Sequence, residues 1–180
     1  GRLHKFVESG IPVVGLEPSC MFTIRDDYPS LFPGPDSEAL ASHVQLLDEF
    51  LFQEHQKGQL KLPLQKISQE KIWVHGHCHQ KAANATGSTL GILKTIPGLE
   101  VELIPSSCCG MAGSFGYESE NYEISMKMAE LSLLPKIRTL DQNHGIVACG
   151  TSCRQQIQHG SGKSAMHTAQ ILRRAISEAS

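Results

Sequence analysis

The sequence predicts an α/β fold, a mainly parallel sheet with helices on both of its faces. Short apolar runs with the length of buried strands alternate with segments of helical spacing, which is typical of parallel βαβ units. A cysteine follows four of these runs at the same four-residue offset; the runs end at Leu16, Val74, Ile104 and Cys149, and the cysteines are Cys20, Cys78, Cys108 and Cys153. Because the carboxyl ends of parallel strands meet at one edge of a sheet, these thiols are expected to share one crevice.

The composition is that of one soluble, globular domain. The chain has 180 residues, of which 40% are hydrophobic and 19% charged, with a formal net charge of −2. Such a charge balance, without runs of like charge, argues against nucleic-acid partners. There is no apolar run of about 18 residues and no signal-peptide pattern, so no transmembrane segment is expected. We expect a cytoplasmic location, with peripheral association at the inner membrane as the alternative.

The first part of the chain predicts two helical regions around one strand. Residues 2–9 are expected to be helical up to Gly10 and Pro12, and residues 11–16 (IPVVGL) form a buried strand. Residues 21–32 are expected to add a helical turn or two. Asp36 or Ser37 can then cap a long helix from Glu38 to about Gln56. Residues 57–70 are polar and contain proline, and are therefore expected to be a loop.

The second part predicts a regular alternation of strands and helices. The expected strands are residues 71–75, 101–104 and 146–149, and the expected helices are residues 80–96, 120–134, a short one from Ser152, and 167–179. Strands separated in this way by helices indicate parallel pairing.

The two parts also share an internal repeat. The segment SGIPVVGLEPSCMFTI near the start resembles HGIVACGTSCRQQI near the end, and SHVQLLDEFL resembles MHTAQILRRAI. We therefore expect a pseudo-twofold arrangement of Rossmann-like βαβ units within one compact domain. In that arrangement residues 1–56 are the last part of a truncated first half, residues 57–70 a linking loop, and residues 71–180 the second half. The chain is accordingly expected to be a fragment of a longer polypeptide.

The cysteines favour metal or redox chemistry over a disulfide scaffold. The chain has six cysteines and no secretory signal, and the adjacent pair Cys108–Cys109 is unsuited to an ordinary disulfide. The alternative is that some are buried free thiols that only pack. Cys149 is expected to pack in this way, because it falls on a strand.

Two further residues are expected to support a bound group. Gly110 permits the unusual backbone that is needed to direct two adjacent sulfurs at one centre. Arg154 directly follows Cys153 and is placed to offset negative charge, as Lys81 is near Cys78. His77 and His79 would face one side of an extended segment, where they either approach the sulfurs or simply pack and face solvent. No paired carboxylates are present for acid–base catalysis, so no catalytic residue is predicted.

Three motifs resemble the cysteine-rich CCG-domain family: HCHQKA at 77–82, SCCGMAGSFGYESE at 107–120 and GTSCRQQI at 150–157. With EPSCMFTIRDDYP at 17–29, the sequence most resembles the C-terminal, iron–sulfur portion of fused FAD-dependent D-2-hydroxyacid dehydrogenases; the family also includes heterodisulfide reductase. The family's usual C-x-x-C ending is replaced here by Cys149 and Cys153 with three residues between them, and the CCG motif of a first half is absent.

The resemblance implies a ligand set and a function. Cys78, Cys108, Cys109 and Cys153 would hold a [4Fe-4S]-type cluster, with Cys20 as a fifth sulfur. The chain would transfer electrons for a flavin-linked oxidoreductase acting on D-lactate, glycolate or 2-hydroxyglutarate, and would not be catalytic by itself. FAD would be bound by the remainder of the polypeptide or by a partner subunit, and a quinone or carrier protein would accept the electrons.

Two alternatives use the same cysteines. Four thiolates also satisfy zinc, which would make this a structural domain that docks other subunits. A thiol/disulfide redox module of the heterodisulfide-reductase kind is the other interpretation.

Overall fold

The computed structural model describes residues 2–177 and has the predicted α/β architecture, with parallel strands flanked by helices. The first part contains α1 (His4–Glu8), β1 (Val13–Gly15), α2 (Pro18–Phe22), a π-helical turn (Thr23–Asp27), α3 (Tyr28–Leu31), α4 (Pro35–His43), β2 (Val44–Leu46) and α5 (Leu47–Gln56). The second part contains β3 (Lys71–His75), α6 (Cys78–Ala82), α7 (Thr86–Leu93), β4 (Glu100–Leu103), two 3₁₀ turns (Phe115–Tyr117 and Ser119–Asn121), α8 (Tyr122–Glu130), α9 (Leu133–Thr139), β5 (His144–Ala148), α10 (Thr151–Ser161) and α11 (Thr168–Ser177). Residues 178–180, where the last helix was predicted to end, lie outside the described part.

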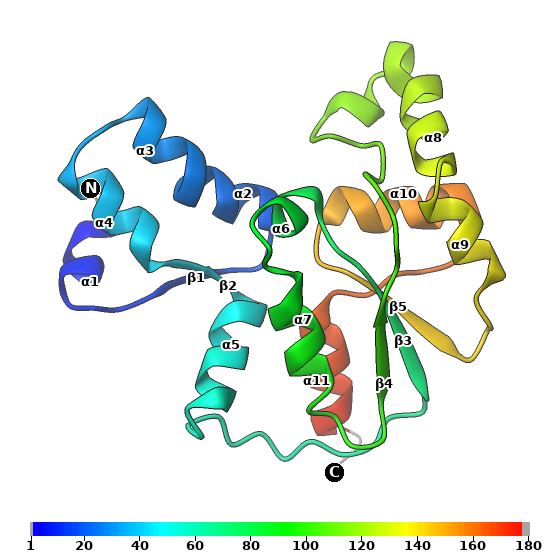
Figure 1. Cartoon of the computed structure of the whole chain (residues 1–180), viewed down its shortest axis with the longest axis horizontal. Coiled ribbons are helices and arrows are strands. Elements are labelled where there is room, and N and C mark those ends of the chain that lie inside the picture. The colour runs from blue at the N-terminus through cyan, green and yellow to red at the C-terminus, as the bar shows by residue number, and fades with distance from the viewer. Residues whose placement is uncertain (1, 178–180) are drawn as a thin grey trace.

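The strands form two parallel sheets. In the larger sheet β3 is central and pairs with β4 on one side and β5 on the other, while β1 pairs with β2 in a two-stranded sheet. Figure 1 shows the larger sheet at the centre of the second part and the first part beside it. The predicted strand positions in the second part are confirmed to within two residues at each end.

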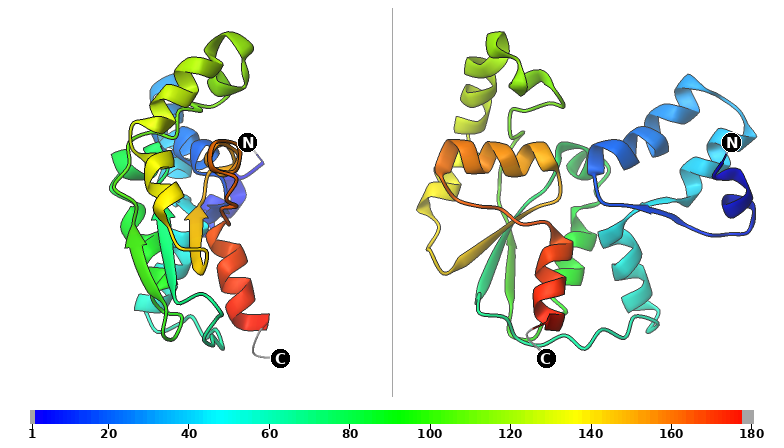
Figure 2. Two further views of the ribbon diagram at one scale, coloured as in Figure 1. Left: turned by 90° about the vertical axis from the view of Figure 1, so that its right-hand side faces the viewer. Right: turned by 180° about the vertical axis from the view of Figure 1, so that it is seen from behind.

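Helices cover both faces of the larger sheet, as the sequence predicted. On one face Ile72 and Val74 of β3 pack with buried residues of α7 and α11. On the other face Ile146 and Ala148 of β5 pack with residues of α9 and α10. This alternation follows from the two-residue period of a strand, and it gives the three layers that Figure 2 shows from the side.

Three predicted helices are shorter than expected, and one of them contains a strand. The helix predicted from Glu38 to Gln56 is wrong, because β2 interrupts it at residues 44–46. Val44 and Leu46 are buried and pair with β1, so a tertiary contact overrides the helical spacing of this segment. The helix predicted over 80–96 breaks near Asn84, which has a φ of 53°, and the one over 120–134 breaks between α8 and α9.

The internal repeat has a structural counterpart. In the first part β1 pairs in parallel with β2, which leads directly into α5. In the second part β5 forms a parallel bridge from Val147 to Met166, and α11 begins two residues later. The two segments that resemble each other in sequence therefore have the same order of strand, helix, parallel pairing and helix.

A buried polar cluster joins the two parts of the chain. Asp48 of α5 is buried, and its Oδ2 accepts hydrogen bonds from Thr89 Oγ1 at 2.6 Å and Thr168 Oγ1 at 3.2 Å. The Cys149 thiol donates a third hydrogen bond at 3.2 Å. Cys149 therefore lies between α5 and α11, and its burial beside the Asp48 carboxylate raises the pKa of its thiol.

No helix among residues 2–177 is long and apolar enough to cross a membrane.

Candidate metal centre

The chain path around β3 creates a crevice at the carboxyl end of the larger sheet. The connection after β3 passes through α6 and α7 on one face of the sheet, whereas α10 follows β5 on the opposite face. Two neighbouring parallel strands whose connections leave to opposite faces form a topological switch point, where ligands bind in α/β sheets. Cys78 opens α6 just after β3, and Cys153 lies in the first turn of α10 just after β5.

The loop after β4 delivers the adjacent pair to the same place. Cys109 is buried, with 3% of its surface exposed, and its Sγ lies 3.3 Å from Sγ of Cys153. Cys108 forms side-chain hydrogen bonds with Cys78 on one side and with Cys109 on the other. The structure thus brings Cys78, Cys108, Cys109 and Cys153 together as one continuous series of sulfur contacts, which we call the sulfur group.

Contacts within the sulfur group divide its protons unequally. The hydrogen bond from Cys109, followed by the one from Cys78, holds the pKa of Cys108 far below the ordinary value of a thiol. Hydrogen bonding to Cys109 lowers the pKa of Cys153 to about 5 despite burial, and the neighbouring His75 ring contributes. Hydrogen bonding to Cys108 correspondingly raises the pKa of both Cys78 and Cys109. Thiolates at Cys108 and Cys153 therefore alternate with thiols, and metal binding would release the two remaining protons.

Gly110 shapes the loop as its place after the cysteine pair suggested. Its φ is +91°, and its backbone N–H lies 3.3 Å from Sγ of Cys108, to which it donates. A Cβ at this position would lie 2.1 Å from the carbonyl oxygen of Ser125. Only glycine can combine this backbone conformation with so close an approach of α8.

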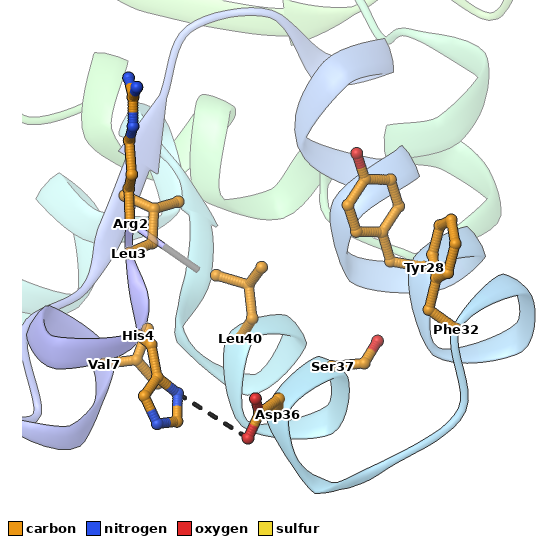
Figure 3. Close-up of a pocket in the computed structure, with 9 residues that line it drawn as sticks. All are labelled: Arg2, Leu3, His4, Val7, Tyr28, Phe32, Asp36, Ser37 and Leu40. Atoms are coloured by element: carbon orange, nitrogen blue, oxygen red, sulfur yellow. Dashed lines mark ion pairs between the residues drawn. The ribbon is translucent and has the colours of Figure 1, made fainter.

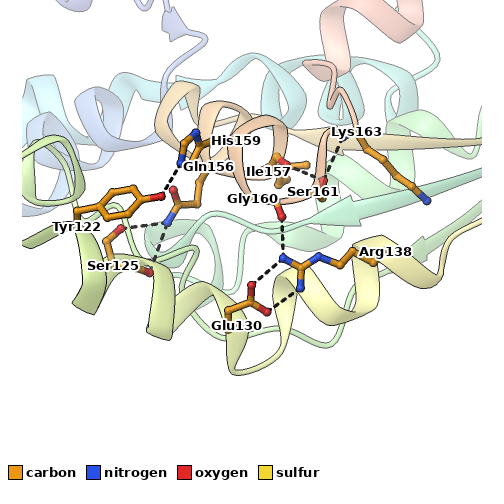
Figure 4. Close-up of polar contacts among 10 residues, drawn as sticks. All are labelled: Tyr122, Ser125, Glu130, Arg138, Gln156, Ile157, His159, Gly160, Ser161 and Lys163. Carbon is orange, nitrogen blue, oxygen red and sulfur yellow. Dashed lines mark hydrogen bonds and ion pairs between the residues drawn. The ribbon is translucent and has the colours of Figure 1, made fainter.

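Polar contacts fasten α8 and α9 to α10, the helix that carries Cys153. Gln156 donates to Ser125 Oγ at 3.0 Å, and Tyr122 is hydrogen-bonded to His159 at 2.8 Å (Figure 4). Arg138 of α9 pairs with Glu130 and also donates to the carbonyl oxygen of Gly160 (Figure 4). These contacts fix the Cys108–Cys109 loop between α8 and α10.

The three histidines near Cys78 have different surroundings. His79 is exposed and its ring lies edge-on to Phe22 and His77. His77 is partly buried and its Nδ1 accepts a hydrogen bond from the His79 backbone N–H, which caps α6. His75, at the end of β3, is 1% exposed, and one of its ring nitrogens lies within 4.8 Å of the sulfurs of both Cys109 and Cys153. His75 is therefore the histidine that joins the sulfur group, which the sequence pattern around Cys78 did not single out.

Two predicted residues lie apart from the sulfur group. Cys20 is exposed on α2, which packs against α6, and among residues 2–177 it is not in the group of mutually close metal-ligating side chains. Arg154 donates to the carbonyl oxygens of Ala148 and Cys149 at 2.9 and 2.6 Å. Its guanidinium thus secures the turn between β5 and α10. Lys81 likewise donates to the carbonyl oxygen of Ser106, which ties α6 to the loop before Cys108.

Glu17 is a second residue that the sequence did not identify. Its carboxylate accepts hydrogen bonds at 2.9 Å from the backbone N–H and from the hydroxyl of Thr151, the first residue of α10. Burial raises the pKa of Glu17, but these hydrogen bonds and the one from Ser19 outweigh it, so the pKa lies below 4.5. The first part of the chain thereby caps the helix that carries Cys153.

The variant Glu17→Gln is expected to be less stable than the wild type near neutral pH. Because the folded-state pKa is lowered, the carboxylate stabilises the fold above the pKa of the unfolded chain, and this contribution is lost as the pH falls through the folded-state pKa. The difference in melting temperature between variant and wild type should therefore shrink in acid. The exposed Glu120 offers a control, and a Glu120→Gln change of equal size would contradict the capping role.

A separate cavity of about 500 Å³ lies in the first part of the chain. Tyr28 and Phe32 of α3 line it together with Leu3 and Leu40, and His4 approaches Asp36 at 3.8 Å across its mouth (Figure 3). None of its lining residues is a cysteine. The cavity lacks paired carboxylates or an activated nucleophile, so the sulfur group remains the stronger candidate for chemistry.

Comparison with known proteins relates the chain to parts of dehydrogenases. It is 30% identical over 169 residues to one subunit of the anaerobic glycerol-3-phosphate dehydrogenase of Escherichia coli K12, covering 93% of this chain and 41% of that protein. It is 31% identical over 173 residues to a D-2-hydroxyglutarate dehydrogenase of Pantoea ananatis, and 30% identical over 172 residues to that of E. coli K12, covering 94% of this chain and 16% of the relative in both cases. The chain therefore spans less than half the length of these relatives. No family model and no solved structure matches it.

Proposed function

We propose that this chain is the iron–sulfur electron-transfer domain of a flavin-linked 2-hydroxyacid oxidoreductase. The observation that carries the proposal is the sulfur group, in which four thiols from three strand-end loops meet at the switch point of the sheet. Donors of this chemistry suit a [4Fe-4S]-type cluster, which cysteine thiolates hold. When bound, such a cluster would accept and release electrons one at a time.

The residues around the sulfur group have supporting roles in this proposal. Cys78, Cys108, Cys109 and Cys153 would be the ligands, and Gly110 would let the adjacent pair face one centre while its N–H bonds to a ligand sulfur. Arg154 would add positive charge near the cluster while holding the β5–α10 turn. Cys20 would supply a fifth sulfur from α2.

The names of the relatives support the reaction class. The D-2-hydroxyglutarate dehydrogenases and the glycerol-3-phosphate dehydrogenase are all enzymes that oxidise a carbinol carbon. For this chain we propose D-2-hydroxyglutarate, D-lactate or glycolate as the substrate of the whole enzyme. A flavin elsewhere in the polypeptide or in a partner subunit would take the substrate's hydride, and a quinone or carrier protein would receive the electrons.

The repeat supports a division of the chain into two halves. Residues 1–56 would belong to the first half and residues 71–180 to the second, with residues 57–70 as the link between them. The Asp48 cluster and the Glu17 cap both cross between the halves, which favours one cooperative unit.

Anaerobic reconstitution of the chain with ferrous iron and sulfide tests the cofactor. We expect broad visible absorption, with iron and acid-labile sulfide bound in comparable amounts. A colourless protein with stoichiometric zinc and no sulfide would contradict the proposal and favour a structural zinc domain, whereas reversible dithiol oxidation without metal would favour a thiol/disulfide module.

A further inference from the structure

His75 lies in a polar environment that satisfies only one of its two ring nitrogens. Its Nδ1 is 2.8 Å from Oγ of Ser106, whereas Nε2 is buried and has no hydrogen-bond partner among the described residues. The ring is 1% exposed, so water does not reach it from the surface. A buried nitrogen without a partner costs about 1–3 kcal/mol, and such a group in a native fold calls for an explanation.

The hydrogen bonds of Ser106 determine which nitrogen carries the proton. The Ser106 hydroxyl donates to the carbonyl oxygen of Ile104 at 3.5 Å, and it therefore accepts from Nδ1–H of His75. In the neutral ring Nε2 then has a free lone pair. This is the tautomer in which a second-shell oxygen orients a histidine that binds metal through its other nitrogen.

The position of the ring relative to the sulfurs completes the argument. Potential ligand atoms of His75, Cys109 and Cys153 all lie within 4.8 Å of one another, and all three residues are buried. Since Nδ1 is engaged by Ser106, Nε2 is the atom left to act as a ligand. Nothing in the His77 or His79 environment is comparable, because His77 Nδ1 caps α6 and His79 is exposed.

We propose that His75 Nε2 is a metal ligand beside Cys109 and Cys153, so that the centre has a mixed sulfur and nitrogen donor set. This inference rests on the proposed metal centre but does not depend on the cluster type. Imidazole is neutral, so the centre would carry less negative charge than one held by thiolates alone. A cluster so ligated would be reduced at a higher potential, as in centres where histidine replaces cysteine.

Cobalt(II) is a suitable probe, because it occupies both thiolate and imidazole sites. The chain is loaded anaerobically with Co²⁺ alone, and binding at the sulfur group is recognised by thiolate-to-cobalt absorption that Cys109→Ser removes. Proton NMR of the loaded wild type, with histidine labelled with ¹⁵N, then detects the Nδ1–H of a cobalt-bound imidazole as a strongly shifted, exchangeable signal. We expect one such signal, which persists in His77→Gln and is lost in His75→Gln.

The outcomes separate this inference from the proposed function. Thiolate-to-cobalt absorption without a shifted histidine signal in the wild type would overturn the role of His75 and leave the sulfur group as a metal site. A signal that survives in His75→Gln would also overturn it. A chain that binds neither cobalt nor iron and sulfide would overturn both proposals, whereas a histidine-ligated cobalt site in a chain that assembles no cluster would overturn the iron–sulfur function alone. The wild-type spectrum decides the matter even if His75→Gln does not fold.

Discussion

Replacing Cys109 with serine is expected to lower the affinity of the chain for metal by more than about 100-fold, the upper range for loss of a second-shell partner. Cys109 is buried at the centre of the sulfur group and contacts both Cys108 and Cys153, so its loss breaks the series in two. In the longer enzyme proposed above, substrate should still reduce the flavin, but electrons should no longer reach the acceptor. Metal analysis of the chain and rapid-mixing measurement of flavin reduction, alongside steady-state reduction of the acceptor, test these two expectations.

Cys149→Ser is the matched control for this experiment. Cys149 is equally buried and also follows a predicted strand, but its thiol is bonded to Asp48 and Thr168 instead of to the sulfur group. The Cys149 variant should therefore keep its metal. If Cys149→Ser emptied the site, or if Cys109→Ser slowed flavin reduction itself, the ligand assignment or the separation of the two tasks would be wrong.

Replacing Gly110 with alanine is expected to destabilise the fold by about 2–5 kcal/mol. The left-handed backbone costs a residue with a Cβ about 1–2 kcal/mol, and forcing an atom into a packed region costs about 1–3 kcal/mol more. The second term is large here because the new Cβ would meet backbone atoms of Ser125 in α8, which a rotamer change does not relieve. Urea denaturation of the metal-free chain measures the effect without the contribution of a bound metal.

Gly113→Ala isolates the contribution of this clash. Gly113 lies in the same loop with a φ of +68°, but a Cβ there would have nothing within 4 Å. It should cost only the backbone term, about 1–2 kcal/mol. Equal destabilisation by the two variants would contradict the close packing of Gly110 beneath α8.

Local pattern was sufficient to predict the second part of the fold. Its strands are short, apolar and separated by helical spacing, and strands 71–75, 101–104 and 146–149 all appear close to their predicted positions. The first part was harder to predict, because residues 44–46 carry the spacing of a helix and become a strand only through pairing with residues 13–15. Since that partner lies far along the chain, no local pattern identifies it.

The candidate site divides in the same way. The placement of Cys78, Cys108, Cys109 and Cys153 followed from the rule that parallel strands end at one edge, and the requirement for glycine at position 110 followed from the adjacent pair. Whether Cys20 contributes stays a prediction, since it follows a strand of the other sheet. The same four-residue step thus led Cys20 and Cys153 to different surroundings.

By itself the sequence determined the α/β class, the parallel strands and the loops that carry the thiols, because periodicity and residue type along a segment fix these. Only the tertiary structure decided that Glu17 caps α10 and that His75 faces Cys109 and Cys153. These contacts join residues on different elements, and their geometry depends on how the helices pack against the sheet. A side chain's chemistry is written in the sequence, but its partner is set by packing, which reduces the distance between remote residues to that of a hydrogen bond.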